Sequence, residues 1–116
     1  MIKVRAVEKQ RYDTMGDWQF IADDLEVKVT DLGDERMNLA LAIHEIVEAY
    51  LCKAHGISER DVDIWDLSYP KERGEPGEDV QCPYHNEHMI AQSIEYLVLN
   101  ALGVSIASYE RKFHGD

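Results

Sequence analysis

The sequence has few cysteines, no long apolar run and few basic residues, and each of these features argues against a class of protein. Its only cysteines, Cys52 and Cys82, allow one disulfide bond at most, and in a reducing compartment such thiols are more often free or metal-bound. No apolar run approaches the ~20 residues that cross a bilayer, and residues 1–10 lack the apolar core of a signal peptide. We therefore expect a cytoplasmic protein that does not insert into a membrane.

Basic residues are scarce relative to acidic ones. The chain has 23 Asp and Glu against 12 Lys and Arg, a formal net charge of −11 at pH 7. Because such a surface repels phosphate backbones, nucleic acid is not an expected partner. The sequence also lacks a Gly-rich phosphate loop, a nucleophilic serine motif and paired Cys-x-x-Cys motifs. Phosphoryl transfer and Rossmann-type redox chemistry therefore have no support.

Length and pattern predict one α+β domain over residues 1–116. The chain is long enough for a single core, and 45% of its residues are hydrophobic. Residues 1–32 alternate between apolar and polar side chains, which predicts two or three antiparallel strands with a hairpin turn at Asp23–Asp24. We expect this small antiparallel sheet to pack against two principal helices.

The two helices are predicted over about 34–55 and from Pro83 to about Leu102. The first is apolar on nearly all sides, so we expect it to be buried nearly all round. The second should bury one apolar face, made of Ile90, Ile94, Leu97, Val98 and Ala101.

The remaining segments have weaker patterns. Residues 57–70 are expected to form a short helical turn and then an extended piece, and residues 71–81 an exposed loop. The tail after Gly103 is expected to add a strand or to be irregular.

The first helix carries His44, Glu45 and Glu48 within an otherwise apolar stretch. A buried carboxylate without a partner costs several kcal/mol, and a metal ion is the strongest compensation for it. His44 and Glu48 are four residues apart, so both can reach one ion, with Glu45 placed as a general base as in zinc peptidases. The alternative is a solvent-exposed stripe with weak i, i+4 attraction.

Further candidate ligands stand in the segment CPYHNEHM, at the start of the second helix. His85 and His88 lie on the border of its apolar face, where a half-buried side chain can reach a neighbouring helix. Together with His44 and Glu48 they supply the three or four ligands of a zinc site. We therefore predict that these four residues bind zinc or another divalent metal. The alternative is a polar helix start whose histidines are exposed to solvent.

Other residues near these clusters have lesser expected roles. Cys52 and Cys82 are second-choice ligands, and Cys52 is better explained as a small buried apolar residue. Tyr84 and Glu87 are candidates for contact with a ligand side chain or a substrate. His55 lies about 16 Å along the helix from the first histidine, too far to share its ion, and is expected to interact with the helix dipole.

The order of these segments resembles a family of small proteins encoded by bacteriophages and prophages. The resemblance is carried by GDWQF, LEVKVTD, IHEIVEAYLC and PYHNEH and spans residues 11–104. That family looks like a reduced relative of the zincin metallopeptidases, which implies a zincin-like fold and the cytoplasm of a bacterial host. It also implies that His44 and Glu48 are metal ligands and that Glu45 is the general base. Glu48 stands where zincins usually have a second histidine.

Three functions remain open on this basis. The first is a zinc-dependent hydrolase that resembles a metallopeptidase, with an extended peptide or protein partner held by the strand LEVKVT if that strand lies at a sheet edge. The second is a non-catalytic interaction module whose two helices are clamped by a structural metal. The third is an all-helical nucleotide pyrophosphohydrolase, whose magnesium site Glu45 and Glu48 would supply in part, although the predicted strands do not suit it.

Overall fold

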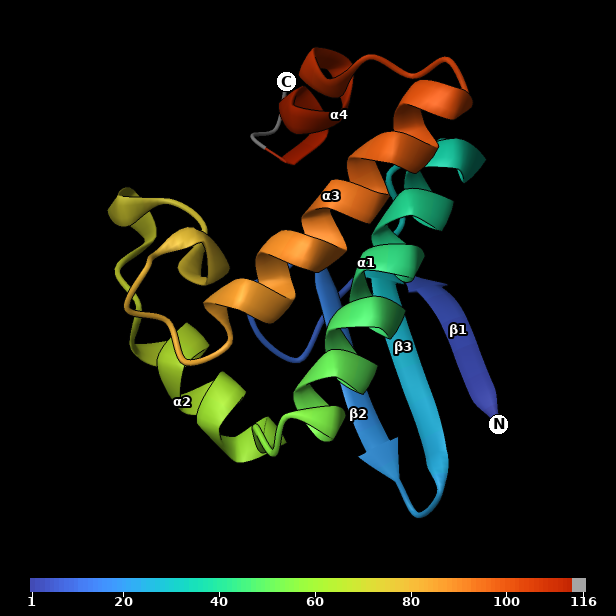
Figure 1. The fold of residues 1–116 in the computed structure, drawn as a ribbon. Coiled ribbons are helices and arrows are strands. Elements are labelled where there is room, and N and C mark those ends of the chain that lie inside the picture. The colour runs from blue at the N-terminus through green and yellow to red at the C-terminus, as the bar shows by residue number, and fades with distance from the viewer. Residues whose placement is uncertain (114–116) are drawn as a thin grey trace.

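The computed structural model describes residues 1–113, which form an α+β fold with a three-stranded sheet (Figure 1). The strands are β1 (Ile2–Val7), β2 (Gly16–Ile21) and β3 (Asp24–Thr30), in the spatial order β1-β3-β2. The predicted hairpin joins β2 to β3 through Ala22 and Asp23, one residue earlier than expected. The α+β class and the hairpin are thus confirmed.

The sheet is mixed, so the prediction of an antiparallel sheet was wrong for β1. β2 pairs antiparallel with β3, whereas β1 pairs parallel with it. The segment 8–15 leaves β1 and enters β2 at the same end of the sheet, so those two strands run in opposite directions. Because β3 lies between them, it must be parallel to one and antiparallel to the other. The strand LEVKVT belongs to β3. Because β3 is the central strand, it cannot bind a peptide as an edge strand.

The helices are α1 (Glu35–Ala54), α2 (Glu59–Ser68), α3 (His85–Ala101) and α4 (Ile106–Phe113), with short 3-10 turns η1 (Lys71–Arg73) and η2 (Pro76–Glu78) before α3. α1 contacts β2 and β3 on one side and α3 on another. The two long helices were predicted within about two residues of their observed ends. None of the helices in residues 1–113 combines the length and hydropathy of a bilayer crossing.

Local interactions set the ends of α1. The carboxylate of Asp34 accepts hydrogen bonds from the backbone N–H groups of Arg36 and Met37, which caps the first turn. After the helix, Gly56 adopts a φ of 71°, in the left-handed region that glycine enters at little cost.

Two shorter helices replace predicted irregular segments. α2 forms where only a helical turn was expected, because Ser58 caps it by accepting a hydrogen bond from the Asp61 N–H and Val62 is buried beneath it. α4 forms where a strand or irregular tail was expected, and its Tyr109 is 1% exposed. The burial of Val62 and Tyr109 depends on the tertiary structure, and the hydropathy pattern of helices of ten and eight residues does not reveal it.

The core lies between the sheet and α1. Leu25, Val27 and Val29 project from β3 and are almost completely buried, and small side chains such as Ala40 and Ala49 of α1 are buried too. α1 was predicted to be buried nearly all round. The side that faces the sheet is buried, but the prediction was wrong for the opposite side, where Leu39 and Tyr50 are exposed. The predicted buried face of α3 is likewise largely exposed, with Leu97 67% exposed.

Candidate metal centre

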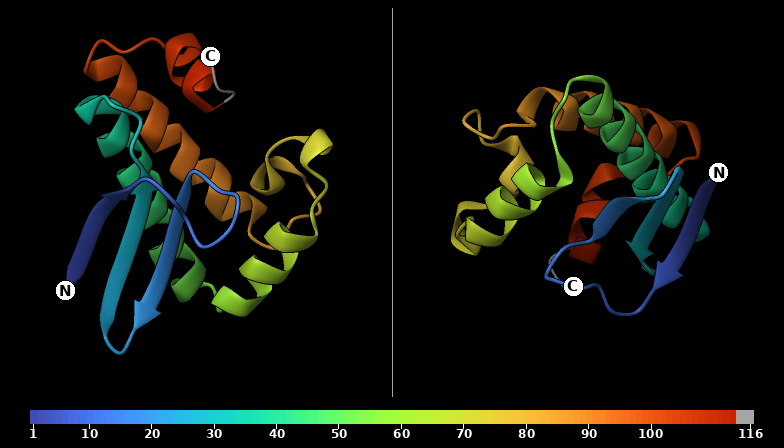
Figure 2. Two further views of the ribbon diagram at one scale, coloured as in Figure 1. Left: turned by 180° about the vertical axis from the view of Figure 1, so that it is seen from behind. Right: turned by 90° about the horizontal axis from the view of Figure 1, so that it is seen from below.

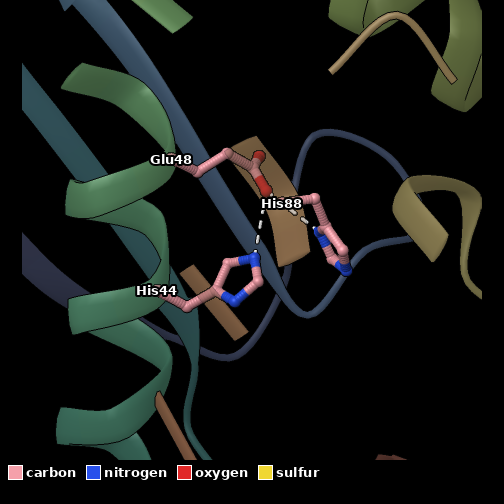
Figure 3. A group of neighbouring side chains, drawn as sticks. All are labelled: His44, Glu48 and His88. Atoms are coloured by element: carbon pink, nitrogen blue, oxygen red, sulfur yellow. Dashed lines mark hydrogen bonds and ion pairs between the residues drawn. The ribbon is translucent and has the colours of Figure 1, made fainter. Parts of the chain in front are cut away.

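Three of the four predicted ligands converge between α1 and α3 (Figure 3). His44 and Glu48 lie one turn apart on α1, and the His44 Nε2 atom is 3.0 Å from Glu48 Oε2. His88 approaches from the first turn of α3, with its Nδ1 atom also 3.0 Å from Glu48 Oε2. One donor atom from each residue lies within 4.8 Å of the other two, and all three side chains are buried. Among residues 1–113 this is the one group of three His, Cys, Asp or Glu with such geometry.

Side chains from α3, α4 and β2 hold these residues in place. Glu95 of α3 shares a hydrogen bond with His44 Nδ1 at 2.7 Å, and Tyr109 of α4 donates to the other oxygen of Glu95. Trp18 of β2 donates from its indole Nε1 to Glu48 Oε1 at 3.1 Å. His44 and Glu48 are thus each oriented by a hydrogen bond with a residue outside the group, as is usual around metal sites.

Glu95, Tyr109 and Trp18 were not predicted as part of the site. The spacing of Glu95, seven residues after His88, was a usable signal, because it places both side chains on the same edge of α3. For Tyr109 and Trp18 the sequence carries no comparable signal, since α4 and β2 reach the site only through the tertiary fold.

Glu45 lies beside the group and is not part of it. Its Oε2 atom is 3.9 Å from His44 Nε2, and its carboxyl packs against Gly16 of β2, where an added Cβ atom would lie 2.6 Å from Glu45 Cδ. No side-chain hydrogen bond of Glu45 occurs among the described residues, so its oxygens are free to bind a water or a substrate. Burial, reinforced by the nearby Glu48 carboxylate, raises the pKa of Glu45 well above its usual range.

The electrostatics of the group favour a positive charge at its centre. Burial disfavours the charged form of Glu48, but hydrogen bonds with His44 and His88 outweigh it and lower the pKa of Glu48 to about 2. Burial likewise disfavours a charged His44, yet hydrogen bonds with Glu48 and Glu95 raise the pKa of His44 well above its usual value. The carboxyl groups of Glu48 and Glu95 thus favour a positive charge at the position of this imidazole.

His85, the fourth predicted ligand, lies outside the group. Its Nδ1 atom is 2.9 Å from the carbonyl oxygen of Gly77 in η2, so the ring is turned toward that loop. Gly77 also lies against the His88 ring so closely that a Cβ atom there would overlap it. The Nδ1 atom of His88 faces Glu48, whereas its Nε2 atom is buried and has no hydrogen-bond partner among the described residues.

The remaining candidates make other contacts. Cys52 and Cys82 are free, buried thiols that are not near enough to the group to complete it, and burial raises the pKa of Cys82 to about 12. Tyr84 is hydrogen-bonded to Asp66, and its ring lies 6.2 Å from that of His88. Glu87 contacts His55, the residue at the C-terminal end of α1, with 2.5 Å between Oε2 and Nδ1.

The group forms part of the wall of a cleft of about 1000 Å³. The cleft extends between α3, the free edge of β2, α2 and α4. Twelve of the chain's 23 acidic residues line it, with only two of the 12 basic residues, Lys71 and Arg73. The other eleven acidic and ten basic residues nearly cancel, so the negative charge of the protein is concentrated in the cleft.

Similarity to known proteins adds nothing to this geometry. No protein-family model, no curated protein and no solved structure matches the chain. What the site can do therefore follows from its own donor atoms, burial and charge.

Proposed function

We propose that this protein binds a divalent metal ion, with zinc the best fit, through His44, Glu48 and His88, and that it is a metal-dependent hydrolase of the metallopeptidase type. The observation that carries the proposal is the convergence of two imidazoles and one carboxylate, all buried, in the wall of a large cleft. Two nitrogens and one oxygen are a donor set that zinc accepts readily.

The distances support a metal ion of this size. Ligand atoms about 2.0–2.1 Å from a tetrahedral zinc ion are about 3.4 Å from one another. The Glu48 oxygen is 3.0 Å from a nitrogen of each histidine, so each of these two pairs needs to open by only a few tenths of an ångström, and all three donor atoms already lie within 4.8 Å of one another. Glu95 on the far nitrogen of His44 gives the carboxylate–histidine pair that commonly orients a metal-bound imidazole.

The number of ligands supports catalysis over a purely structural role. Structural zinc sites are usually closed by four protein ligands, whereas catalytic sites have three and an open position. A bound divalent ion would supply Lewis-acid chemistry, lowering the pKa of a water and polarising a substrate carbonyl. Glu45, beside the group and free of side-chain hydrogen bonds to the described residues, would then accept the proton of that water.

An extended, positively charged peptide is the substrate that the surroundings favour. β2 is an edge strand, and its residues Gly16, Asp17 and Trp18 line the cleft. An edge strand can hold an extended peptide by backbone hydrogen bonds. The excess of carboxylates in the cleft attracts cationic side chains and disfavours anionic ones.

A structural metal clamp is the second candidate, because the three donors come from both α1 and α3 and would tie the helices together. The pyrophosphohydrolase is disfavoured by the sheet, which an all-helical bundle lacks, and by the acidic cleft, which repels polyphosphate. A phage or prophage origin stays a prediction from resemblance.

Metal binding is tested by titrating zinc into untagged, metal-free protein by calorimetry, with His88→Ala compared with His85→Ala. Both histidines lie in the first turn of α3, but only His88 belongs to the group. We expect about one ion per chain for the wild type and for His85→Ala, and at least a hundredfold loss of affinity for His88→Ala. Equal affinities in the two variants would exclude this site.

Catalysis is tested with a library of peptides that differ in charge, assayed for cleavage with and without zinc. We expect cleavage of peptides rich in Lys or Arg, loss of activity on chelation, and recovery with zinc. Glu45→Gln should retain zinc but lose activity by at least a hundredfold. Zinc binding without cleavage of any peptide, together with a rise in melting temperature, would instead support the structural clamp.

A further inference from the structure

The outer side of the α1–α3 pair carries a continuous apolar surface that no element in residues 1–113 covers. Both helices run in front of the sheet in Figure 1, and the right panel of Figure 2 shows nothing beyond them. Leu39, Tyr50, Ile90 and Leu97 are between 42% and 67% exposed, although the Tyr50 ring, at one end of this surface, also contacts Phe20 of β2. With their half-buried or small neighbours they form what we call the outer face: Leu39, Ile43, Val47 and Tyr50 of α1, and Ile90, Ile94, Leu97 and Ala101 of α3.

The four outer-face residues of α1 and the four of α3 form two rows that lie side by side, because the two helices pack against each other in antiparallel directions. At one end of the pair, Arg36 donates a hydrogen bond to the carbonyl of Leu102, 3.4 Å away. At the other end, His55 contacts Glu87. Within each row the residues are three or four apart, so they follow one side of their helix. The outer face is thus one apolar strip two helices wide.

This strip carries no charge. From Leu39 to Cys52 the only acidic or basic side chains besides His44 are Glu45 and Glu48, and from Met89 to Ala101 the only one is Glu95. All of these are buried and belong to the metal centre or its surroundings. On a chain in which 30% of residues are charged, an exposed surface of this length without any charge is unusual. A partner for it has to be apolar, because a charge placed here would find no counterion.

The charge of the protein lies on the other side of the same helices. Two positions along a helix turn a side chain by about 200°, so Ile90 and Leu97 point away from His88 and Glu95. The cleft that contains these polar residues holds most of the negative charge. Two copies that meet through their outer faces therefore keep their acidic clefts apart and open, whereas contact through any face near the cleft would bring like charges together.

The size of the strip is enough for self-association. α3 has 17 residues, hence a length of about 25 Å, and two helices side by side are about 20 Å wide. Each copy offers about 500 Å², and two copies would bury about 1000 Å², the lower end of specific interfaces. An apolar face of this kind is self-complementary, as a two-fold symmetric contact requires.

We propose that two copies of this chain associate through their outer faces into a symmetric dimer, in which the two α1–α3 pairs form a four-helix bundle. The metal centres lie on the far sides of the bundle and take no part in the contact. The dimer is therefore independent of the proposed metal binding and hydrolysis. The small area predicts a dissociation constant in the micromolar range.

The experiment is sedimentation equilibrium of the full chain from about 1 to 300 µM, with and without a chelator. The expected mass rises with concentration from the 13.4 kDa of one chain toward twice that value, and chelation leaves the curve unchanged. Leu97→Glu should weaken association at least tenfold, whereas Val80→Glu should not, because Val80 is 82% exposed but stands outside the outer face, in the loop before α3.

Circular dichroism and the melting temperature check that each variant is folded, and Ile90→Glu replaces Leu97→Glu if the latter is not. A wild-type chain that stays monomeric at 300 µM would overturn the proposal, including the case in which the outer face binds a different protein. The proposal would also be overturned if the chain dimerised but Leu97→Glu and Ile90→Glu weakened the dimer no more than Val80→Glu does. All three variants should keep the zinc affinity of the wild type, since none of these substitutions touches the metal centre.

Discussion

At the scale of single residues, His44 is the centre of the buried polar network. Its two ring nitrogens contact Glu48 on one side and Glu95 on the other, at 3.0 Å and 2.7 Å. Glu95 is in turn held by Tyr109. A side chain with both nitrogens engaged has one ring orientation available, which is what a metal ligand requires.

Glu95→Gln should weaken zinc binding by about 10- to 100-fold, the usual cost of removing a carboxylate that orients a ligating histidine. The amide keeps the size of the side chain but not its charge. Glu110→Gln is the control, because Glu110 also lines the cleft but is exposed and has no contact with His44. Zinc titration by calorimetry measures both. Equal affinities would mean that Glu95 does not orient the site.

Asp66 predicts a pH dependence of stability. Burial raises the pKa of Asp66 to about 6, although hydrogen bonds from Tyr84 and Tyr12 oppose the shift. Because this pKa is above the unfolded value of 3.8, the folded state holds its proton more tightly. The contribution of Asp66 to the free energy of unfolding is therefore most favourable below about pH 4 and is lost as the pH rises to about 6.

Asp66→Asn should remove this contribution and make the slope of stability against pH less negative between pH 4 and 6. The change should be smaller than the about 1.4 kcal/mol per pH unit of one full proton, since the carboxyl is partly exposed. Urea unfolding at several pH values measures the slope, and Asp61→Asn, an exposed position on the same helix, is the control. An identical slope in both variants would contradict the prediction.

At the scale of elements, the short turn η2 restricts the position of α3. The carbonyl of Gly77 contacts His85, and its Cα packs against the ring of His88 so closely that no side chain fits between them. A loop between α2 and α3 therefore determines where one of the proposed ligands stands. Sequence patterns of the helices alone do not contain this restriction.

Gly77→Ala should displace the His88 ring and weaken zinc binding at least tenfold, because the new Cβ atom would overlap the imidazole. Glu78→Ala is the matched control in the same turn, since its side chain is exposed. Zinc affinity and the melting temperature are measured for both. Unchanged affinity in Gly77→Ala would show that the turn yields and that His88 is not fixed by it.

At the scale of the whole molecule, metal binding and folding are linked, because the donors are brought together only when α1 and α3 pack. An ion that binds the folded chain alone stabilises it by about 2.7 kcal/mol at 100 times its dissociation constant. For a domain of this size the melting temperature should rise by about 10 °C.

Differential scanning calorimetry with zinc and with a chelator measures that rise. His88→Ala should show no rise with zinc, and His85→Ala should behave as the wild type. A zinc-induced rise that His88→Ala retains would mean that the ion binds elsewhere on the chain.

Part of this structure could be predicted from the sequence by local rules. The hairpin follows from period-2 alternation in LEVKVT, and the limits of α1 follow from the capping residue Asp34 and from Gly56. The closeness of His44 to Glu48 follows from i, i+4 spacing on one helix. His88 was predicted to join them, which the packing of α3 on α1 allows, whereas its neighbour His85 faces η2.

The tertiary structure decided what local patterns leave open. The direction of β1 depends on which end of the sheet the segment 8–15 crosses, and the position of α4 depends on the contact between Tyr109 and Glu95. It also decided which side of α1 and α3 is inside. α1 was expected to be buried nearly all round and α3 on its apolar side, but the buried sides are those that carry Glu45 and Glu48 on α1 and His88 on α3. Burial depends on which elements cover a surface, and only the assembled fold supplies those elements.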